Sequence, residues 1–277
     1  MAKDLYRNRD FIPDFDAISA ETAARSRALA SRVELSRDLN YGPSGRMRFD
    51  LLRPATLRRG APLHIFFHGG YWRSGAKEDH HLVAAPVLAV GGIAAIVTYD
   101  LMPQTRLGAI VGQVRRATDQ LLRQAPCWGA DPARYSASGH SAGAHLASYL
   151  AALGPSDPQD LRLPPLTGLL LVSGLYDLSE IPSSFLKSET QMTPQEAADW
   201  SPLSAQHLPG PRRHLSHGAL ETAPFHDQAQ RFEALLRGGG HPVERVVEPD
   251  LNHMSIVLAL GDPQSRLGDR LAELVAS

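Results

Sequence analysis

Apolar runs alternate with amphipathic stretches along most of the chain. Residues 63–67 and 93–100 are almost continuous apolar runs, which are typical of strands buried on both faces of a parallel sheet. A third run at 166–174 has the same character. Alternating polar and apolar positions at 46–54, closed by a proline, predict another strand. Further strands are expected at 134–139, 212–219 and 242–249.

Helices are predicted between these strands. From residue 107 to residue 124 the apolar positions recur at helical spacing. The stretch 226–240 also reads as a helix and ends in glycines suited to a C-cap. Other helices are expected at 17–36, 141–153 and 255–275. Strands that alternate with helices predict an α/β fold with a mostly parallel central sheet covered by helices on both faces.

One segment breaks this alternation. Residues 175–211 are rich in proline and serine and contain only helical fragments, so we interpret them as a small inserted cap or lid. The first 40 residues or so form a helical amino-terminal segment. A length of 277 residues suits one large α/β domain, and we expect 1–277 to be a single domain.

Composition narrows the classes of binding partner. The chain carries 28 Lys and Arg against 29 Asp and Glu, so it has no net positive charge that would attract nucleic acid or an acidic membrane. We therefore expect a small-molecule substrate and no nucleic-acid or membrane partner. The oligomeric state is not fixed by the sequence, and a homodimer is compatible with it.

The cysteine content and the apolar pattern indicate the compartment. Cys127 is the single cysteine, so no internal disulfide can form, which fits a reducing environment. Residues 1–15 contain charges every few positions and no signal-peptide core. The longest apolar stretch, 91–99, is far too short to span a bilayer. We expect a soluble, cytoplasmic protein.

A candidate nucleophile lies between an expected strand and an expected helix. Residues 139–143 read GHSAG, a G-x-S-x-G pattern with Ser141 at its centre. A serine on a sharp strand-to-helix turn projects its hydroxyl above the sheet edge, and the tight turn requires small residues two positions away on either side. The alternative is an ordinary turn in which Ser141 caps the helix.

The loop at 68–70, His-Gly-Gly, follows another expected strand and suits an oxyanion hole. In acyl transfer, backbone N–H groups stabilise the oxyanion that forms at the attacked carbonyl. One donor should be the amide of Ala142, and a second should come from this loop, whose glycines allow close approach of the main chain. A simple glycine turn at a strand end is the alternative.

The base and the acid follow from chain order. With a strand–serine–helix turn of this kind, the order is Ser, then Asp or Glu, then His. His253 follows the last expected strand across a short turn and is the best base. Glu221 is the one carboxylate in the loop after 212–219, and we favour it as the acid over Asp177, which follows the preceding strand. Asp250 is more suited to shaping its turn.

These motifs resemble the α/β-hydrolase superfamily and, within it, the kynurenine formamidase (arylformamidase) branch. The resemblance is carried by HGGYW at 68–72, GHSAGAHLA at 139–147, SGLYDL at 173–178, WSPL at 200–203 and NH at 252–253. It covers about residues 40 to 260. Esterases of unassigned substrate share these motifs.

The resemblance implies a set of site residues. By position, Ser141 is the nucleophile, His253 is the general base, and Gly70, Tyr71 and Ala142 supply the oxyanion amides. The branch usually has an Asp as the acid, whereas this chain has Glu221 at that position. No metal or organic cofactor is implied.

These observations predict a serine hydrolase acting on a small acyl ester or an aryl formamide through an acyl-enzyme on Ser141. Tyr71 and Trp72 stand next to the oxyanion loop, where Trp72 is a candidate wall for an aromatic leaving group or else a packing residue beneath the cap. The alternatives are a broad short-chain carboxylesterase unrelated to tryptophan breakdown and a non-catalytic binding protein on a hydrolase scaffold.

Overall fold

The computed structural model describes residues 3–155, 157–158 and 161–277; Met1 and Ala2, which begin the charged amino-terminal stretch, lie outside this part. The strands form one large sheet and one small sheet. They are β1 (Glu34–Asn40), β2 (Arg48–Arg53), β3 (Ala61–Phe67), β4 (Ile93–Val97), β5 (Ala130–His140), β6 (Ala152–Leu153), β7 (Gly168–Val172), β8 (Gln206–His207), β9 (Arg212–Gly218) and β10 (Val243–Glu248).

The helices lie between the strands in the chain. The α-helices are α1 (Phe15–Ala30), α2 (Ala84–Ala89), α3 (Leu107–Gln124), α4 (Ala142–Ser148), α5 (Lys187–Thr190), α6 (Pro194–Asp199), α7 (Ala223–Gly238), α8 (Ser255–Leu260) and α9 (Arg266–Ala276). Short 3-10 helices are η1 (Asn8–Asp10), η2 (Lys77–Val83), η3 (Ala125–Trp128), η4 (Ile181–Ser183) and η5 (Pro202–Ser204).

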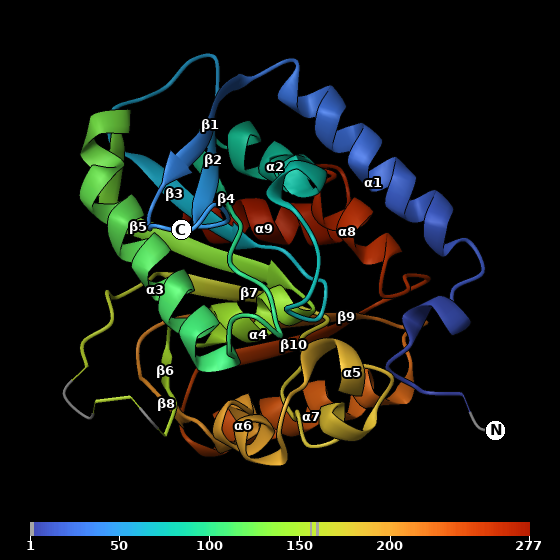
Figure 1. The fold of residues 1–277 in the computed structure, drawn as a ribbon. Coiled ribbons are helices and arrows are strands. Elements are labelled where there is room, and N and C mark those ends of the chain that lie inside the picture. Colours follow the sequence, from blue (N-terminus) through green and yellow to red (C-terminus); the bar gives the residue numbers. More distant parts are fainter. Residues whose placement is uncertain (1–2, 156, 159–160) are drawn as a thin grey trace.

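The large sheet has the strand order β1-β2-β4-β3-β5-β7-β9-β10 (Figure 1). Strand β2 runs antiparallel to both of its neighbours, and every other pair is parallel. The predicted α/β fold with a mostly parallel sheet is therefore confirmed. Because the carboxyl ends of parallel strands meet at one edge, the loops after β3, β5, β9 and β10 are brought together there.

Helices cover both faces of the sheet (Figure 1). Side chains alternate between the faces along β3, so Phe66 packs with apolar residues of α2, α8 and α9, whereas Ile65 and Phe67 pack with those of α3 and α4. The apolar face of α3 explains why its sequence spacing is helical. Six apolar side chains of this helix are buried, namely those of Leu107, Ile110, Val111, Val114, Ala117 and Leu121.

Three element boundaries differ from the sequence prediction. The helix expected at 17–36 ends at Ala30, because residues 34–40 pair with β2 as a polar edge strand. The helix expected at 141–153 ends at Ser148, and Ala152 instead pairs with His207 in the small sheet. The last helix is two helices, α8 and α9, separated by a turn that contains Gly261. Strand pairing decides the first two boundaries, with the adjacent β2 for residues 34–40 and with the distant His207 for Ala152, and helical periodicity cannot detect such pairing.

The segment 175–211 contains η4, α5, α6, η5 and β8 and packs firmly against the body of the protein. Leu186 and Ala197 are fully buried. Trp200 lies so close to Gly108 and Gly154 that a Cβ on either glycine would be 2.6 or 2.7 Å from the indole ring. This segment is therefore an integral layer on the α7 side of the sheet.

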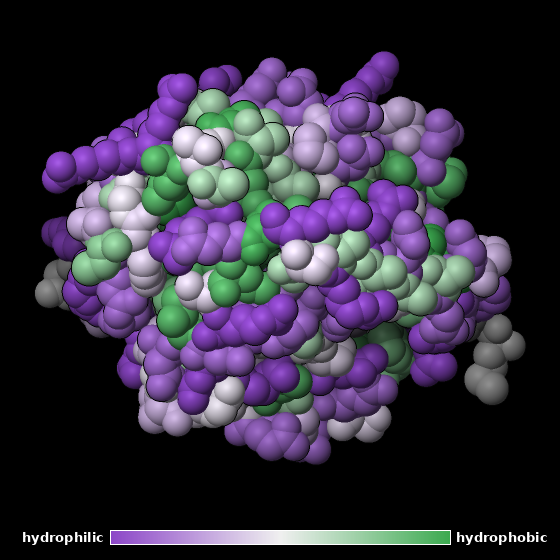
Figure 2. Space-filling view, turned by 90° about the horizontal axis from the view of Figure 1, so that it is seen from above, coloured by the Kyte–Doolittle hydropathy of each residue, from purple (hydrophilic) through white to green (hydrophobic). Residues whose placement is uncertain are grey.

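Hydrophilic residues predominate on the face seen in Figure 2, with smaller groups of apolar residues between them. Within residues 3–155, 157–158 and 161–277, no helix is both long and apolar enough to cross a membrane.

Candidate active site

Three of the four loops expected to carry the chemistry, those after β3, β5 and β10, border one pocket at the carboxyl edge of the sheet. Its volume is about 520 Å³. Ser141 follows β5, Gly70 follows β3 and His253 follows β10, and all three line the pocket. Glu221, after β9, reaches this edge behind His253. The strand order thus brings together residues that are as far apart as 68 and 253 in the chain.

Ser141 occupies a strained turn between β5 and α4. Its φ and ψ are 56° and −121°, a region that residues other than glycine rarely adopt. The flanking glycines are required by contact: a Cβ on Gly139 would lie 2.2 Å from the Gly143 carbonyl oxygen, and one on Gly143 would lie 2.0 Å from the Phe67 oxygen. The turn therefore matches the geometry expected of a nucleophile elbow.

Glu221 and His253 form a buried pair. Glu221 Oε2 lies 2.7 Å from His253 Nδ1. The other carboxylate oxygen accepts hydrogen bonds from Ser173 Oγ at 2.5 Å and from the Gly218 amide at 2.7 Å. Burial alone would raise the pKa of the Glu221 carboxyl, but the charge of His253 and these hydrogen bonds outweigh burial and lower that pKa. Glu221 is thus held as a carboxylate.

The ring of His253 is fixed between two other rings. The centroid of the Phe225 ring lies 4.3 Å from that of His253, and the centroid of the His140 ring lies 4.8 Å away. His140 Nε2 donates a hydrogen bond to the His253 carbonyl oxygen at 2.8 Å. Burial and the nearby His253 lower the pKa of His140 well below its ordinary value. His140 is therefore neutral and adds no positive charge beside the His253 ring.

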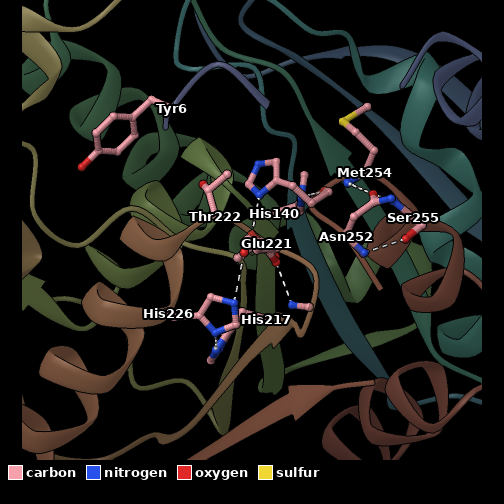
Figure 3. Close-up of polar contacts among 12 residues, drawn as sticks. Tyr6, His140, His217, Glu221, Thr222, His226, Asn252, Met254 and Ser255 are labelled. Atoms are coloured by element: carbon pink, nitrogen blue, oxygen red, sulfur yellow. Dashed lines mark hydrogen bonds and ion pairs between the residues drawn. The ribbon is translucent and has the colours of Figure 1, made fainter. Parts of the chain in front are cut away.

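The loop that carries His253 is held by hydrogen bonds to the side chain of the preceding residue, Asn252. Asn252 Oδ1 accepts hydrogen bonds from the amides of Met254 and Ser255, each at 2.9 Å, at the start of α8. Figure 3 shows this arrangement beside Glu221, with His226 on the other side of Glu221. His226 Nε2 donates to the Glu221 carbonyl oxygen at 3.2 Å, so the backbone of the acid is also restrained.

The loop after β3 has the unusual backbone that its glycines predict. Gly70 has a φ of +109°, and a Cβ there would lie 2.3 Å from the Ser74 carbonyl oxygen. Tyr71 follows with a φ of 50°. Within the described part of the chain, neither the Gly70 amide nor the Tyr71 amide has a hydrogen-bond acceptor, and both residues line the pocket. Ala142 is the first residue of α4, where N–H groups have no partner inside the helix.

Trp72 does not form a wall of the pocket, and that expectation is corrected. Its side chain is fully buried in the core, and its indole nitrogen donates to His145 Nδ1 at 3.2 Å. The structure gives Trp72 the packing role that was the alternative. Its φ is 57°, and its ring packs edge-on against His145 of α4 in the hydrophobic core.

Asp177, the rival acid, is engaged elsewhere. Its carboxylate pairs with Arg231 at 2.9 Å and accepts a hydrogen bond from the Ser179 amide, on the outer side of α7. Asp250 has a φ of 59° and forms part of the turn after β10, as expected. Of the candidate acids, only Glu221 contacts His253 in the described part of the chain.

Several pocket residues had no signal in the sequence. His80 lines the pocket and stacks on His68 with ring centroids 5.7 Å apart. The amino-terminal segment supplies Arg7 and Phe15, and residues 175–211 supply Phe185. Periodicity cannot show that the amino terminus folds back over the carboxyl edge of a sheet formed by residues far along the chain.

The fold and the matched sequence family define the class of protein. The family described as having the alpha/beta hydrolase fold matches residues 64–217, more than half of the chain. The chain belongs to this family, and it is a hydrolase.

Similar proteins within this class include formamidases and esterases. The chain is 28% identical to a kynurenine formamidase of Danio rerio, over 93% of this chain and 91% of that protein, and 29% identical to a kynurenine formamidase of Salmo salar, over 92% and 86%. A solved structure from Silicibacter sp. TM1040, described as a thioesterase, has a TM-score of 0.84 at 24% identity and covers 99% of this chain and 98% of its own. That likeness concerns the fold.

Proposed function

We propose that this protein is a serine hydrolase that cleaves a small acyl ester or an aryl formamide through an acyl-enzyme on Ser141. The observation that carries the proposal is the buried Glu221–His253 pair, 2.7 Å between Oε2 and Nδ1, beside a pocket that Ser141 enters from a strained elbow. A carboxylate that binds Nδ1–H leaves Nε2 as a lone-pair acceptor, the form that a general base needs.

In the first step, His253 Nε2 takes the proton of Ser141 Oγ as that oxygen attacks the substrate carbonyl. The carbonyl π electrons move to its oxygen, and the amides of Gly70, Tyr71 and Ala142 are proposed to stabilise the oxyanion. Collapse of the intermediate breaks the bond to the leaving alcohol or aniline, which receives the proton from His253. Glu221 stabilises the transient imidazolium without taking its proton.

In the second step, water attacks the acyl-enzyme. His253 accepts a proton from this water, the same amides stabilise the second oxyanion, and the acid is released as the proton returns to Ser141 Oγ. The neutral His140 ring beside His253 supports both steps, because a second positive charge there would oppose protonation of the base.

The lining of the pocket supports an aromatic substrate. Tyr71, Phe15 and Phe185 line the same pocket as Ser141. Relatives named as kynurenine formamidases cover nearly the whole chain, which supports a formamide of this kind as the leading substrate class. The alternative is a broad short-chain carboxylesterase, which the similarity to an esterase, LipQ, of Mycobacterium tuberculosis favours, at 28% identity over 78% of this chain and 56% of that protein.

A substrate panel tests the proposal. We expect Ser141-dependent hydrolysis of N-formylkynurenine with a kcat/KM at least equal to that for p-nitrophenyl acetate and p-nitrophenyl butyrate. A far higher kcat/KM for the simple esters would contradict the formamidase reading and favour the carboxylesterase. Hydrolysis of none of the three by the folded protein, or equal hydrolysis by Ser141→Ala, would contradict the serine mechanism and revive a binding role.

The domain organisation and the location of the protein remain part of this proposal. The single domain, with residues 175–211 as its cap, is supported by Phe185 and Glu189, which line the pocket from that segment. We propose a cytoplasmic location and no nucleic-acid partner from the composition of the chain. The same composition is compatible with a homodimer.

A further inference from the structure

The charged side chains around the pocket are not equivalent. Three guanidinium groups line it, those of Arg7, Arg9 and Arg73. Arg73 pairs with Glu189, and Arg9 pairs with Asp16. Within the described residues, Arg7 has no carboxylate within 4.0 Å. Arg7 is therefore the pocket cation whose charge is not neutralised by the protein itself.

The guanidinium group of Arg7 is held in place by an aromatic ring. Its Cζ lies 5.0 Å from the centroid of the Phe185 ring, and Phe185 also lines the pocket. Stacking on the face of a ring leaves the N–H donors in the plane of the guanidinium group, where a carboxylate can accept two of them. The ring thus presents the donors of Arg7 to an anion.

The backbone that carries Arg7 is tied to the catalytic loops. Tyr71 Oη donates to the Tyr6 carbonyl oxygen at 2.5 Å, and Thr222 Oγ1 donates to the Leu5 carbonyl oxygen at 2.7 Å. Tyr71 belongs to the loop after β3, and Thr222 directly follows Glu221. The backbone next to Arg7 is therefore held against both proposed functional loops.

The same segment is also tied to the cap. Tyr6 Oη donates to Glu180 at 2.8 Å, and the Phe185 amide donates to Asp4 Oδ2 at 2.6 Å. Figure 3 shows Tyr6 on the same side of the site as Thr222. These bonds hold the backbone at Arg7, and the contact with Phe185 restricts its exposed side chain, which lowers the entropy lost when the guanidinium group binds an anion.

We propose that Arg7 selects substrates that carry a carboxylate remote from the bond to be cleaved. The inference rests on the proposed hydrolysis at Ser141 and names the substrate class of that site. The pocket as a whole is not strongly basic, since Asp79 and Glu189 also line it. Selection therefore comes from the guanidinium group of Arg7 and not from a net positive charge of the pocket.

The test compares two acetates that differ in a single charge, 4-acetoxyphenylacetic acid and the neutral 4-acetoxyphenylacetamide. Arg7→Gln should lower kcat/KM for the acid by about 10–100-fold, mainly through KM, because a charge-assisted hydrogen bond to the substrate is lost. The value for the amide should stay within about twofold. Arg7→Lys should retain part of the preference as a point charge.

Lys3→Gln is the matched control, because Lys3 carries the same charge on the same segment and bonds to the Asp10 carbonyl oxygen outside the pocket. It should leave the acid-to-amide ratio unchanged. An equal effect of Arg7→Gln on both acetates, or no effect on either, would overturn the role of Arg7. Loss of hydrolysis of both acetates by the unmodified protein would instead overturn the proposed function.

Discussion

At the scale of single residues, the environment of Glu221 supports its proposed role as the acid that orients His253. One oxygen is occupied by His253, and the other accepts hydrogen bonds from Ser173 and the Gly218 amide. A Cβ on Gly218 would lie 2.1 Å from the Leu251 carbonyl oxygen, so the loops after β9 and β10 are in close contact there. Both carboxylate oxygens of Glu221 are thus held by hydrogen bonds, and its loop packs against the loop that carries His253.

Replacing this acid should impair catalysis far more than binding. Glu221→Gln keeps the size of the side chain but removes the charge that fixes the His253 tautomer and stabilises the imidazolium. We expect kcat for p-nitrophenyl acetate to fall about 10³–10⁴-fold with little change in KM. Steady-state kinetics at pH 8 measure both constants.

The matched control for that substitution is Asp177→Asn, which removes a carboxylate paired with Arg231 and distant from His253. It should leave kcat within a few-fold of the unmodified value. A large loss of kcat in Asp177→Asn together with a small loss in Glu221→Gln would contradict the assignment of the acid.

The site residues differ in how far the sequence could predict them. Ser141 and Gly70 follow from short motifs, because strained turns restrict which residues can occupy them. His253 and Glu221 required chain order as well, since His253 follows the last expected strand and one carboxylate lies in the loop after 212–219. Arg7 and Phe185 reach the pocket through long-range folding of segments without a motif. Trp72 was misplaced because its neighbour in the core, His145, lies far along the chain.

At the scale of elements, the turn between β5 and α4 depends on close packing against β3. The Gly143 Cα faces the Phe67 carbonyl oxygen at the end of β3, and Gly139 faces Gly143. The central strands β3, β4 and β7 were predictable because they are buried on both faces and therefore read as apolar runs. The end of α4 was not, since it depends on the pairing of Ala152 with His207.

A methyl group at this contact should disturb the elbow. In Gly143→Ala the added Cβ would lie 2.0 Å from the Phe67 oxygen, which is backbone and cannot move aside cheaply. We expect the free energy of unfolding to fall by about 1–3 kcal/mol or more and kcat to fall with it. Urea denaturation and steady-state kinetics measure these two effects.

Gly112 in α3 offers the opposite case, because its Cβ position is open and its helical backbone suits alanine. Gly112→Ala should be neutral or raise the free energy of unfolding by about 0.5–1 kcal/mol. If Gly143→Ala were as stable and as active as Gly112→Ala, the packing account of the elbow would be wrong.

At the scale of the whole molecule, buried neutral histidines couple folding to pH. His64 in β3 bonds to Ser136 Oγ at 2.8 Å and to Ser138 Oγ at 2.7 Å, and burial lowers its pKa to about 3. Unfolding restores a value near the ordinary 6.5, so the unfolded chain binds one more proton between pH 3 and pH 6.5. The contribution of neutral His64 to stability is therefore present above about pH 6.5 and is lost as the pH falls toward 3.

His64→Gln should remove the extra proton that the unfolded chain binds relative to the folded chain. Between pH 4 and pH 6, the slope of the unfolding free energy against pH should decrease by about 1.4 kcal/mol per pH unit, whatever the variant's absolute stability. Urea denaturation at several pH values measures the slope. An unchanged slope, or a ¹H–¹⁵N NMR titration of His64 with a pKa near 6.5 in the folded protein, would contradict this account.

The central claim is that Ser141, activated by His253, is the nucleophile of this hydrolase. The most direct measurement is the reaction of the folded protein with a fluorophosphonate, followed by peptide mass mapping of the adduct. The account predicts one adduct per chain, on Ser141, formed at a rate that falls by orders of magnitude in His253→Ala. An adduct elsewhere, no adduct on folded protein, or an equal rate in His253→Ala would contradict it.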